Sequence, residues 1–348
     1  MLQTHTETEI AILKEPALLA LDWQARLKKT AKLDRTKPSS VAFIGTGTSF
    51  HAALWAHWLC RSENALPSRA STTWDELAAP SGKEDELLVI ISQRGNKGLT
   101  KELLATLSKK QRHIVISAEN SPMGSHPFIY TSPQETSNAH TMSLIGAMGA
   151  CSEIIASLLS KAAADRLRRE RKATAKLIDA VLNEAAAPLI LDSALTRLHV
   201  VGGGPFHPVA LELALKAREM AHSSAQGYAL EEILHGPFTS IENDDAIILL
   251  EPLKNPTSGL TKRLYVNRAK ACRQAVEAIG SLLIGPRWPR AVSREGAKLG
   301  LAWQALLPLA WGQMFFLTHS KHWGFDPDSN RQEDPRYKDA KNAAEYVV

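Results

Sequence analysis

Cysteine is scarce in this sequence, with three residues in a chain of 348. Cys60, Cys151 and Cys272 are far apart, and each lies in an apolar stretch with helical character. Because a disulfide framework or a zinc site needs cysteines at short, regular spacings, we interpret these residues as buried thiols in a reducing compartment. The twelve histidines likewise show no spacing that is typical of a metal site.

The sequence also lacks a long uninterrupted hydrophobic run. Its most apolar long stretch, Leu299 to Leu317, contains Gln304, Pro308 and Gln313, which favours a core helix over a membrane span. The N-terminus is polar and acidic and has no apolar core, so no signal peptide is expected. These absences predict a cytoplasmic protein that does not bind a membrane.

Strong charge of one sign is confined to one run. The net charge is +5, and the segment from Lys161 to Lys176 holds seven bases and two acids. No aromatic residue interleaves with these bases, so the run favours a solvated connecting helix over a nucleic-acid contact. The hydrophobic content of 44% and the charged content of 22% are typical of a soluble globular protein. The length suggests two domains or one large pseudo-symmetric unit.

Short apolar runs that end in glycine turns and lead into helices occur twice. Val41 to Ile44 is followed by a Gly-Thr-Gly-Thr-Ser turn, and Leu198 to Val201 is followed by three glycines. Further predicted strands are Leu87–Ser92, His113–Ser117, Ala246–Leu250 and Ser281–Ile284. Because strands that alternate with helices form parallel sheets, we predict an α/β protein with two pseudo-symmetric, doubly wound parallel sheets flanked by helices.

The predicted domains follow from this order. We expect a helical lead-in that is interrupted at Glu15-Pro16, and a further helix from Leu177 to Ala186 after the basic run. The boundaries are 1–40 for the lead-in, 41–160 for the first domain, 161–190 for a helical connector, 191–322 for the second domain and 323–348 for the tail.

The predicted helix from Val209 to Ala221 carries Glu212, Lys216 and Glu219 at spacings of four and three. These spacings place the three charged side chains on one face of the helix. Such a set is often a solvated salt-bridge face. Here leucine and alanine neighbours leave little polar surface, and buried charges are costly unless they are paired or used in a reaction. Both interpretations stay open from spacing alone.

This helix and the nearby loops resemble a known family. Its stretches ALELALKAREM, GYALEEILHGP and GTGTSFHA are similar to motifs of the sugar isomerase (SIS) family, including the isomerase part of glucosamine-6-phosphate synthase. The resemblance covers about residues 9–330 and implies SIS-type domains. It also implies that Ser49, beside Gly47 and Thr48, contacts a substrate phosphate. No glutaminase domain or helix-turn-helix segment accompanies these motifs, so glutamine-dependent amination and transcriptional regulation are not expected.

The second loop departs from the family pattern in charge. Where relatives have SQSGET this sequence has SQRGNK, so Ser92 and Gln93 match, whereas Arg94 and Lys97 replace a serine and a threonine. Two cations in place of two neutral donors suit an anion. They also suit an anion whose shape differs from that of the phosphate bound in the family. The alternative is that both side chains point to solvent and the affinity for phosphate has been lost.

A third segment and the tail supply further candidates. Asn138, Ala139 and His140 stand where the family hydrogen-bonds sugar hydroxyls, so the resemblance implies an altered sugar-recognition surface, although His140 is equally a candidate core histidine. The tail has an Asp-Pro-Asp motif similar to the family's ending. After it, Lys338 and Lys341 are the candidates for a lysine near the sugar.

The resemblance also implies a reaction. Interconversion of an aldose and a ketose moves a proton between C1 and C2 through an enediol. Carried over by position, Glu219 is the base, His235 assists ring opening in a neighbouring subunit's site, and Lys216 and Glu212 orient the site. The family needs no metal or organic cofactor for this step. We therefore expect an isomerase of a phosphorylated or otherwise anionic sugar that forms a homodimer or a higher even homo-oligomer.

Two other functions stay open on the same scaffold. One is deamination with isomerisation of an amino-sugar phosphate, or deglycation of a sugar-phosphate amine adduct, because Glu219 and His235 fit either reaction. The other is a catalytically silent sugar-phosphate-binding protein, which the survival of the acid, base and cation positions disfavours. The sequence does not identify the sugar, nor whether its anion is phosphate, sulfonate or carboxylate.

Overall fold

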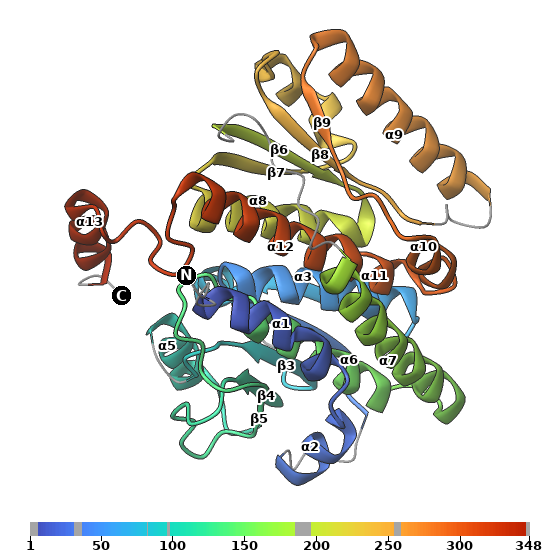
Figure 1. Cartoon of the computed structure of the whole chain (residues 1–348). Coiled ribbons are helices and arrows are strands. Elements are labelled where there is room, and N and C mark those ends of the chain that lie inside the picture. Colours follow the sequence, from blue (N-terminus) through green and yellow to red (C-terminus); the bar gives the residue numbers. More distant parts are fainter. Residues whose placement is uncertain are drawn as a thin grey trace. The chain divides into compact units, whose positions relative to one another are not determined.

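The computed structural model describes residues 6–30, 37–81, 83–95, 98–184, 196–253 and 259–345, and Figure 1 labels its elements. The chain forms two compact units. The first unit comprises Lys14–Thr136, His140–Ala175 and Gln332–Val348, and the second comprises Met1–Leu13, Ser137–Ala139 and Lys176–Arg331. Each unit is therefore assembled from segments that are far apart in the sequence.

The first unit is built on a five-stranded parallel sheet with the order β2-β1-β3-β4-β5. Its strands are β1 (Ser40–Gly45), β2 (Ser68–Thr72), β3 (Glu86–Ile91), β4 (His113–Ser117) and β5 (Phe128–Tyr130). Every residue of β3 is buried, and so is every residue of β1 after the first. Strands that read as continuous apolar runs are buried in this way when helices cover both faces of a parallel sheet.

Five helices of the first unit surround this sheet. They are α2 (Trp23–Thr30), α3 (Thr48–Ser62), α4 (Thr73–Ala78), α5 (Gly98–Thr106) and α6 (Met142–Ser157). Leu103 and Leu104 of α5 share an apolar cluster with Ala42, Ile44 and Ile90 of the sheet. Helix α3 packs against β1, β2 and α6. Burial of these apolar side chains is the main force that holds the helices to the sheet.

The second unit contains a four-stranded parallel sheet with the order β7-β6-β8-β9. Its strands are β6 (Arg197–Gly202), β7 (Ser224–Ala229), β8 (Ala246–Leu250) and β9 (Leu282–Ile284). One face is covered by α8 (His207–Ala221), backed by α12 (Leu306–Trp323), and the other by α9 (Gly259–Ile279) (Figure 1). Gly227 lets α8 approach β7 closely, because a Cβ there would lie 2.7 Å from the carbonyl oxygen of Ala210.

The two sheets share one topology. In each sheet the first strand in the sequence lies between the second and the third, and neighbouring strands run parallel. This arrangement confirms the prediction of two pseudo-symmetric, doubly wound sheets. The strand order reverses between β1 and β3 in one sheet and between β6 and β8 in the other. Open parallel sheets bind ligands beyond the carboxyl ends of their strands at such switch points.

The bounds of the remaining helices differ from the prediction at two places, Glu15-Pro16 and Leu177. These helices are α1 (Glu7–Leu19), α7 (Lys161–Glu184), α10 (Arg290–Gly296), α11 (Leu301–Gln304) and α13 (Pro335–Glu345). The break predicted at Glu15-Pro16 is wrong, because Pro16 lies inside α1 and the chain turns later, where Asp22 accepts a hydrogen bond from the Ala25 amide (3.0 Å) and starts α2.

The second correction concerns the helix predicted from Leu177. That segment continues α7, which contains no glycine or proline to end it, and predicted positions 185 and 186 lie outside the described residues. In the described parts of the chain, no helix is both long enough and apolar enough to cross a bilayer.

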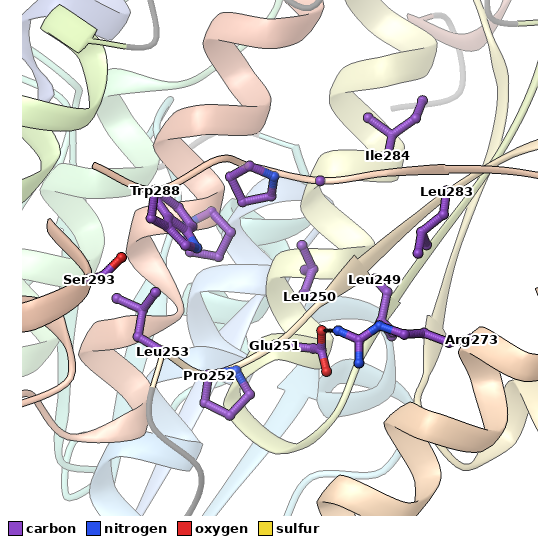
Figure 2. Close-up of a pocket in the computed structure, with 13 residues that line it drawn as sticks. Leu249, Leu250, Glu251, Pro252, Leu253, Arg273, Leu283, Ile284, Trp288 and Ser293 are labelled. Carbon is purple, nitrogen blue, oxygen red and sulfur yellow. Dashed lines mark ion pairs between the residues drawn. The ribbon is translucent and has the colours of Figure 1, made fainter. Parts of the chain in front are cut away.

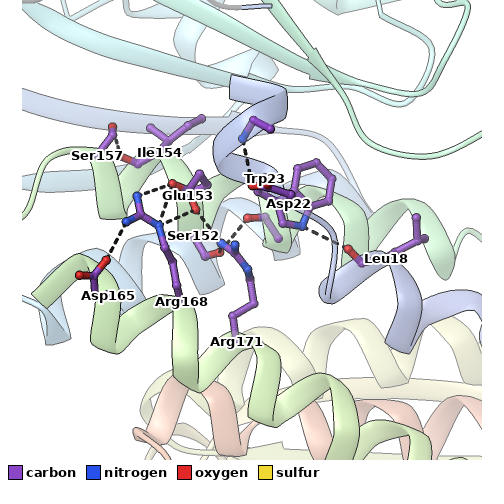
Figure 3. A network of polar contacts seen from close by, with 12 residues as sticks. Leu18, Asp22, Trp23, Ser152, Glu153, Ile154, Ser157, Asp165, Arg168 and Arg171 are labelled. Carbon is purple, nitrogen blue, oxygen red and sulfur yellow. Dashed lines mark hydrogen bonds and ion pairs between the residues drawn. The ribbon is translucent and has the colours of Figure 1, made fainter. Parts of the chain in front are cut away.

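A buried carboxylate joins α6 to α7 in the first unit (Figure 3). Glu153 is 1% exposed, and its oxygens accept hydrogen bonds from Arg168 (2.6 Å) and Arg171 (3.1 Å). Arg171 is also buried and donates to the hydroxyl of Ser152 (3.0 Å), whereas Arg168 also reaches the more exposed Asp165 (3.2 Å). The basic run predicted to be a solvated connector therefore supplies two cations that neutralise a core carboxylate.

Glu153→Ala should lower the free energy of unfolding by about 3–5 kcal/mol, because Arg171 would stay buried without its carboxylate. The matched control is Asp165→Ala, which removes the other carboxylate at Arg168 from a half-exposed position and should cost about 0–1 kcal/mol. Urea titration followed by circular dichroism measures both values. Equal losses in the two variants would contradict a stabilising role for the buried network.

Candidate active site

Two glycines shape the loop after β1. A Cβ on Gly45 would lie 2.5 Å from the carbonyl group of Ser49, and Gly47 has a φ of +57°, which glycine adopts without strain. Helix α3 begins at Thr48, and the preceding Gly47 has no side chain to cap it. The amides of Ser49 and Phe50 donate to the carbonyls of Thr46 (3.2 Å) and Gly47 (2.9 Å), so the start of this 15-residue helix presents a positive helix end beside two hydroxyl side chains. Such a combination binds anions.

The loop after β3 is held by Ser117 at the end of β4 and by Ser121 beyond it. The backbone carbonyl of Gln93 accepts hydrogen bonds from the hydroxyls of Ser117 (3.2 Å) and Ser121 (2.9 Å). The hydroxyl of Ser92 donates to the carbonyl of Gly95 (3.1 Å), whose φ of +64° turns the chain. Within the described residues, the buried Nε2 of Gln93 has no hydrogen-bond partner. Gln93 is therefore held by its backbone, and its buried side-chain donor has no partner among the described residues.

The two loops lie at one edge of the first sheet. Strands β1 and β3 pair along their lengths, so the loops that follow them, around Ser49 and around Ser92, start side by side at the switch point. Arg94 is exposed in the second of these loops. Lys97, the other cation predicted for this loop, lies outside the described residues.

The predicted sugar-recognition segment is held by two different contacts. The buried carboxylate of Glu135 accepts hydrogen bonds from three backbone amides at the start of α6, each 2.9 Å long, so this helix end already has an anion. His140 has a side chain that is 31% exposed and lies 3.8 Å from Glu135. In the second unit, Asn138 donates to the carbonyl oxygen of Asp328 from its backbone (3.1 Å) and its side chain (3.0 Å), and Ala139 is fully buried.

The Asp-Pro-Asp motif of the tail holds the start of α1 in the second unit. Asp328 accepts hydrogen bonds from the amides of Glu7 (3.0 Å) and Thr8 (2.8 Å), and the hydroxyl of Thr8 also contacts that of Ser137 (2.6 Å). Asp328 thus caps a helix. Sequence analysis missed this role because Asp328 and Thr8 are 320 residues apart. Lys338 is exposed on α13, in the first unit.

Three charged side chains form a buried cluster on α8. The Nζ atom of Lys216 lies 3.2 Å from Oε1 of Glu212 and 2.6 Å from Oε2 of Glu219. The side chains of Lys216 and Glu212 are 0% and 1% exposed, whereas that of Glu219 is 19% exposed. The interpretation of this face as a solvated salt bridge is therefore wrong. Glu219 is the member of the cluster that solvent or a ligand reaches most easily.

Burial and pairing set the protonation of this cluster. Burial disfavours the charged form of Lys216, but attraction to Glu212 and Glu219 outweighs it and raises the pKa of the lysine. Burial also raises the pKa of Glu219, against the opposing attraction of Lys216. The lysine is therefore charged at neutral pH. The pKa of Glu219 lies closer to the range in which a carboxylate is an effective general base.

His235 lies on an exposed turn of the second unit, after the 3₁₀ turn Glu232–Leu234. Its side chain is 70% exposed, and Nε2 lies 3.0 Å from Oε1 of Glu231, which also pairs with Arg268 of α9 (2.6 Å). This imidazole is accessible to a ligand or to a second chain. Among the described residues, no group of three or more histidine, cysteine and acidic side chains is placed to hold a metal ion.

No protein-family model matches the chain. It is similar in sequence to two glutamine–fructose-6-phosphate aminotransferases (isomerizing). Identity is 24% over 219 residues to the enzyme of Methanothermobacter thermautotrophicus and 27% over 261 residues to that of Streptomyces coelicolor. The alignments take in 61% and 68% of this chain but 37% and 42% of the relatives. The chain thus spans about two fifths of the length of these curated relatives.

Solved structures share the fold over nearly the whole chain. The C-terminal domain of glucosamine-fructose-6-phosphate aminotransferase from Francisella tularensis superposes with a TM-score of 0.69 at 18% identity, covering 94% of this chain and 98% of that one. Tagatose-6-phosphate ketose/aldose isomerase from Escherichia coli superposes with a TM-score of 0.66 at 16% identity, covering 93% of this chain and 95% of that one. Glucosamine-6-phosphate deaminase from Thermotoga maritima superposes with a TM-score of 0.63 at 19% identity, covering 92% of this chain and 97% of that one. The chain has the fold of sugar isomerase (SIS) domains and resembles the isomerase part of these aminotransferases.

Lys216→Met should loosen α8, because Glu212 would remain buried with no cation beside it. We expect the opening free energy of the α8 amides, measured by hydrogen–deuterium exchange, to fall by about 3–5 kcal/mol. The control Arg218→Met removes an exposed cation from the same helix and should change that free energy by about 0.5 kcal/mol or less. Similar exchange rates in both variants would argue against a structural role for the buried charge.

Proposed function

We propose that this chain is an aldose–ketose isomerase that acts on a phosphorylated or otherwise anionic sugar, with sulfonated sugars among the candidates. Similarity to the isomerase part of the aminotransferases supports chemistry on a sugar phosphate. The observation that carries the proposal is the α8 cluster, in which buried Lys216 holds the partly exposed Glu219 at 2.6 Å. A fixed carboxylate with a raised pKa is suited to proton transfer at a carbon next to a carbonyl.

The proposed reaction is a proton transfer with no gain or loss of atoms. Glu219 removes the proton from C2 of the open-chain aldose, and O1 takes up a proton as the enediol forms. The carboxyl then returns its proton to C1 while the hydroxyl on C2 gives up its own, which yields the ketose. Lys216 orients Glu219, and Glu212 keeps the lysine charged. The exposed His235 supplies the acid for ring opening in the site of a neighbouring subunit of an even homo-oligomer.

The anion of the substrate is assigned to the switch point of the first sheet. The start of α3 supplies a positive helix end and two hydroxyls there, the loop after β3 supplies the buried side-chain amide of Gln93, and Arg94 adds a positive charge. The full set of proposed anion ligands is Gly47, Thr48, Ser49, Ser92, Gln93, Arg94 and Lys97. The residues assigned to the sugar by resemblance alone are Asn138, Ala139, His140 and Lys338.

Glu219→Gln should lower turnover by about 10²–10⁴ while substrate binding is kept, because the amide preserves the shape of the side chain but cannot accept the proton. In the unmodified enzyme, burial raises the pKa of Glu219, and the base must be ionised. The value of kcat/KM should therefore fall as the pH drops through this raised pKa, above the ordinary value of about 4.3 for a glutamic acid. Glu295→Gln, which changes an exposed carboxylate of α10, is the control and should leave both quantities unchanged.

The assay follows aldose and ketose by NMR, together with release of ammonia or amine. Isomerisation without release supports the proposal. Release in proportion to turnover would instead assign the chain to deamination or deglycation, and binding without any turnover would assign it to the silent binding proteins. Unchanged turnover in Glu219→Gln would move the base to another residue.

Arg94→Ser should raise KM with little change in kcat, because a charge-assisted hydrogen bond to an anion contributes about 1.5–3 kcal/mol, or roughly ten- to a hundredfold in affinity. The remaining affinity should also depend less on salt. Lys101→Ser removes an exposed cation from α5 in the same unit and controls for the change in net charge. If Arg94 points to solvent, the two variants will have the same KM.

A further inference from the structure

A cavity of about 490 Å³ lies at the carboxyl ends of β8 and β9, in the second unit (Figure 2). The end of β8 and the residues after it form one wall, and the end of β9 and the residues after it form another. Arg273 of α9, Ser293 of α10 and Pro308 of α12 complete the lining. This volume is in the usual range for small-molecule sites. Its lining includes neither the charged cluster on α8 nor the turn that carries His235.

The cavity lies at the carboxyl edge of the second sheet, one strand away from the switch point between β6 and β8. Strand β8 borders the switch point of the second sheet, and the cavity opens beyond the carboxyl ends of the strands. Its wall is fixed by the buried side chain of Gln304. The Leu253 amide donates to Oε1 of this residue (2.9 Å), and its Nε2 donates to the Leu299 carbonyl (2.8 Å). The site is thus formed by the fold itself.

Most of the residues that line the cavity are apolar, although polar atoms make up nearly half of its surface, and the charged side chains lie at one end. Figure 2 shows Glu251 and Arg273 facing one another at one end, and Trp288 and Leu253 toward the other. The apolar wall includes Pro252, Leu253, Ile284, Pro286, Trp288 and Pro308. Glu251 and Arg273 form an ion pair, and their side chains are 28% and 43% exposed, so a ligand in the cavity has access to both charges.

We propose that this cavity binds a free α-amino acid with an apolar side chain. The ammonium group of the ligand pairs with Glu251, and its carboxylate pairs with the guanidinium of Arg273. Charge-assisted hydrogen bonds of this kind are the strong ones, and an arginine fork matches a carboxylate in two places. The apolar side chain lies against the indole of Trp288 and the proline rings, which replaces water on both surfaces.

The polar groups of the cavity disfavour other ligands. A neutral sugar would bring no charge to a cavity that offers one carboxylate and one guanidinium, and charge-assisted hydrogen bonds are the strong ones. A phosphate would meet the carboxylate of Glu251 beside the guanidinium, so like charges would repel. A zwitterion brings one positive and one negative group to a site that offers one of each.

Isothermal titration of the full chain with L-leucine and L-phenylalanine tests the proposal. We expect one amino acid to bind per chain. N-acetyl-L-phenylalanine lacks the ammonium and L-phenylalaninamide lacks the carboxylate, so each should bind at least about tenfold more weakly. Equal binding of the three phenylalanine compounds, binding of glucose instead, or no binding of either amino acid at millimolar concentration would overturn the proposal. These results do not depend on isomerase activity.

Variants of the ion pair locate the bound amino acid. Glu251→Gln and Arg273→Met should each weaken binding at least about tenfold, and partly exposed pairs such as this one contribute little to stability, so both should fold. Arg268→Met is the matched control, because it breaks the ion pair with Glu231 from the same helix outside the cavity. Binding that is unchanged in Glu251→Gln and Arg273→Met, or equally weakened in Arg268→Met, would place the ligand elsewhere.

Discussion

An ammonium group buried between two carboxylates is the interaction on which the proposed chemistry depends. Lys216 stays charged without water because Glu212 and Glu219 surround it on the same helix. The helix is held in turn by close packing on two sides. A Cβ on Gly227 of β7 would collide with its backbone, and one on Gly312 of α12 would lie 2.5 Å from the side chain of Leu213. Close packing on two sides thus fixes the position of the helix that carries Glu219.

The two sheets share a topology, but the chemistry at their carboxyl edges differs. In the first sheet, glycines, hydroxyl side chains and a helix start meet at the switch point together with Arg94, which suits an anion. In the second, proline-containing loops and Trp288 line a cavity that has one ion pair at one end, which suits a zwitterion. The strand order decides where loops meet, and the loop residues decide what binds there.

Sequence patterns predicted most of the apolar strands, but they missed the short β5 and the polar strands β2 and β7. Strands β1, β3 and β8 appear as short apolar runs because both of their faces are covered by helices. Strands β2 and β7 lie at sheet edges and are partly exposed. Their serine, threonine and glutamine residues form neither an apolar run nor an alternation of apolar and polar residues, so no sequence pattern marks these strands. Their pairing with β1 and β6 is what makes them strands.

The sequence by itself determined the strand–turn–helix order, the glycine turns and the common face of Glu212, Lys216 and Glu219, because these depend on local geometry and on spacing along the chain. Only the tertiary structure decided that this face is buried, that Asp328 caps α1, and that Glu251 meets Arg273. Burial and pairing of distant residues depend on which elements pack together, and that outcome is a property of the whole chain that no local pattern contains.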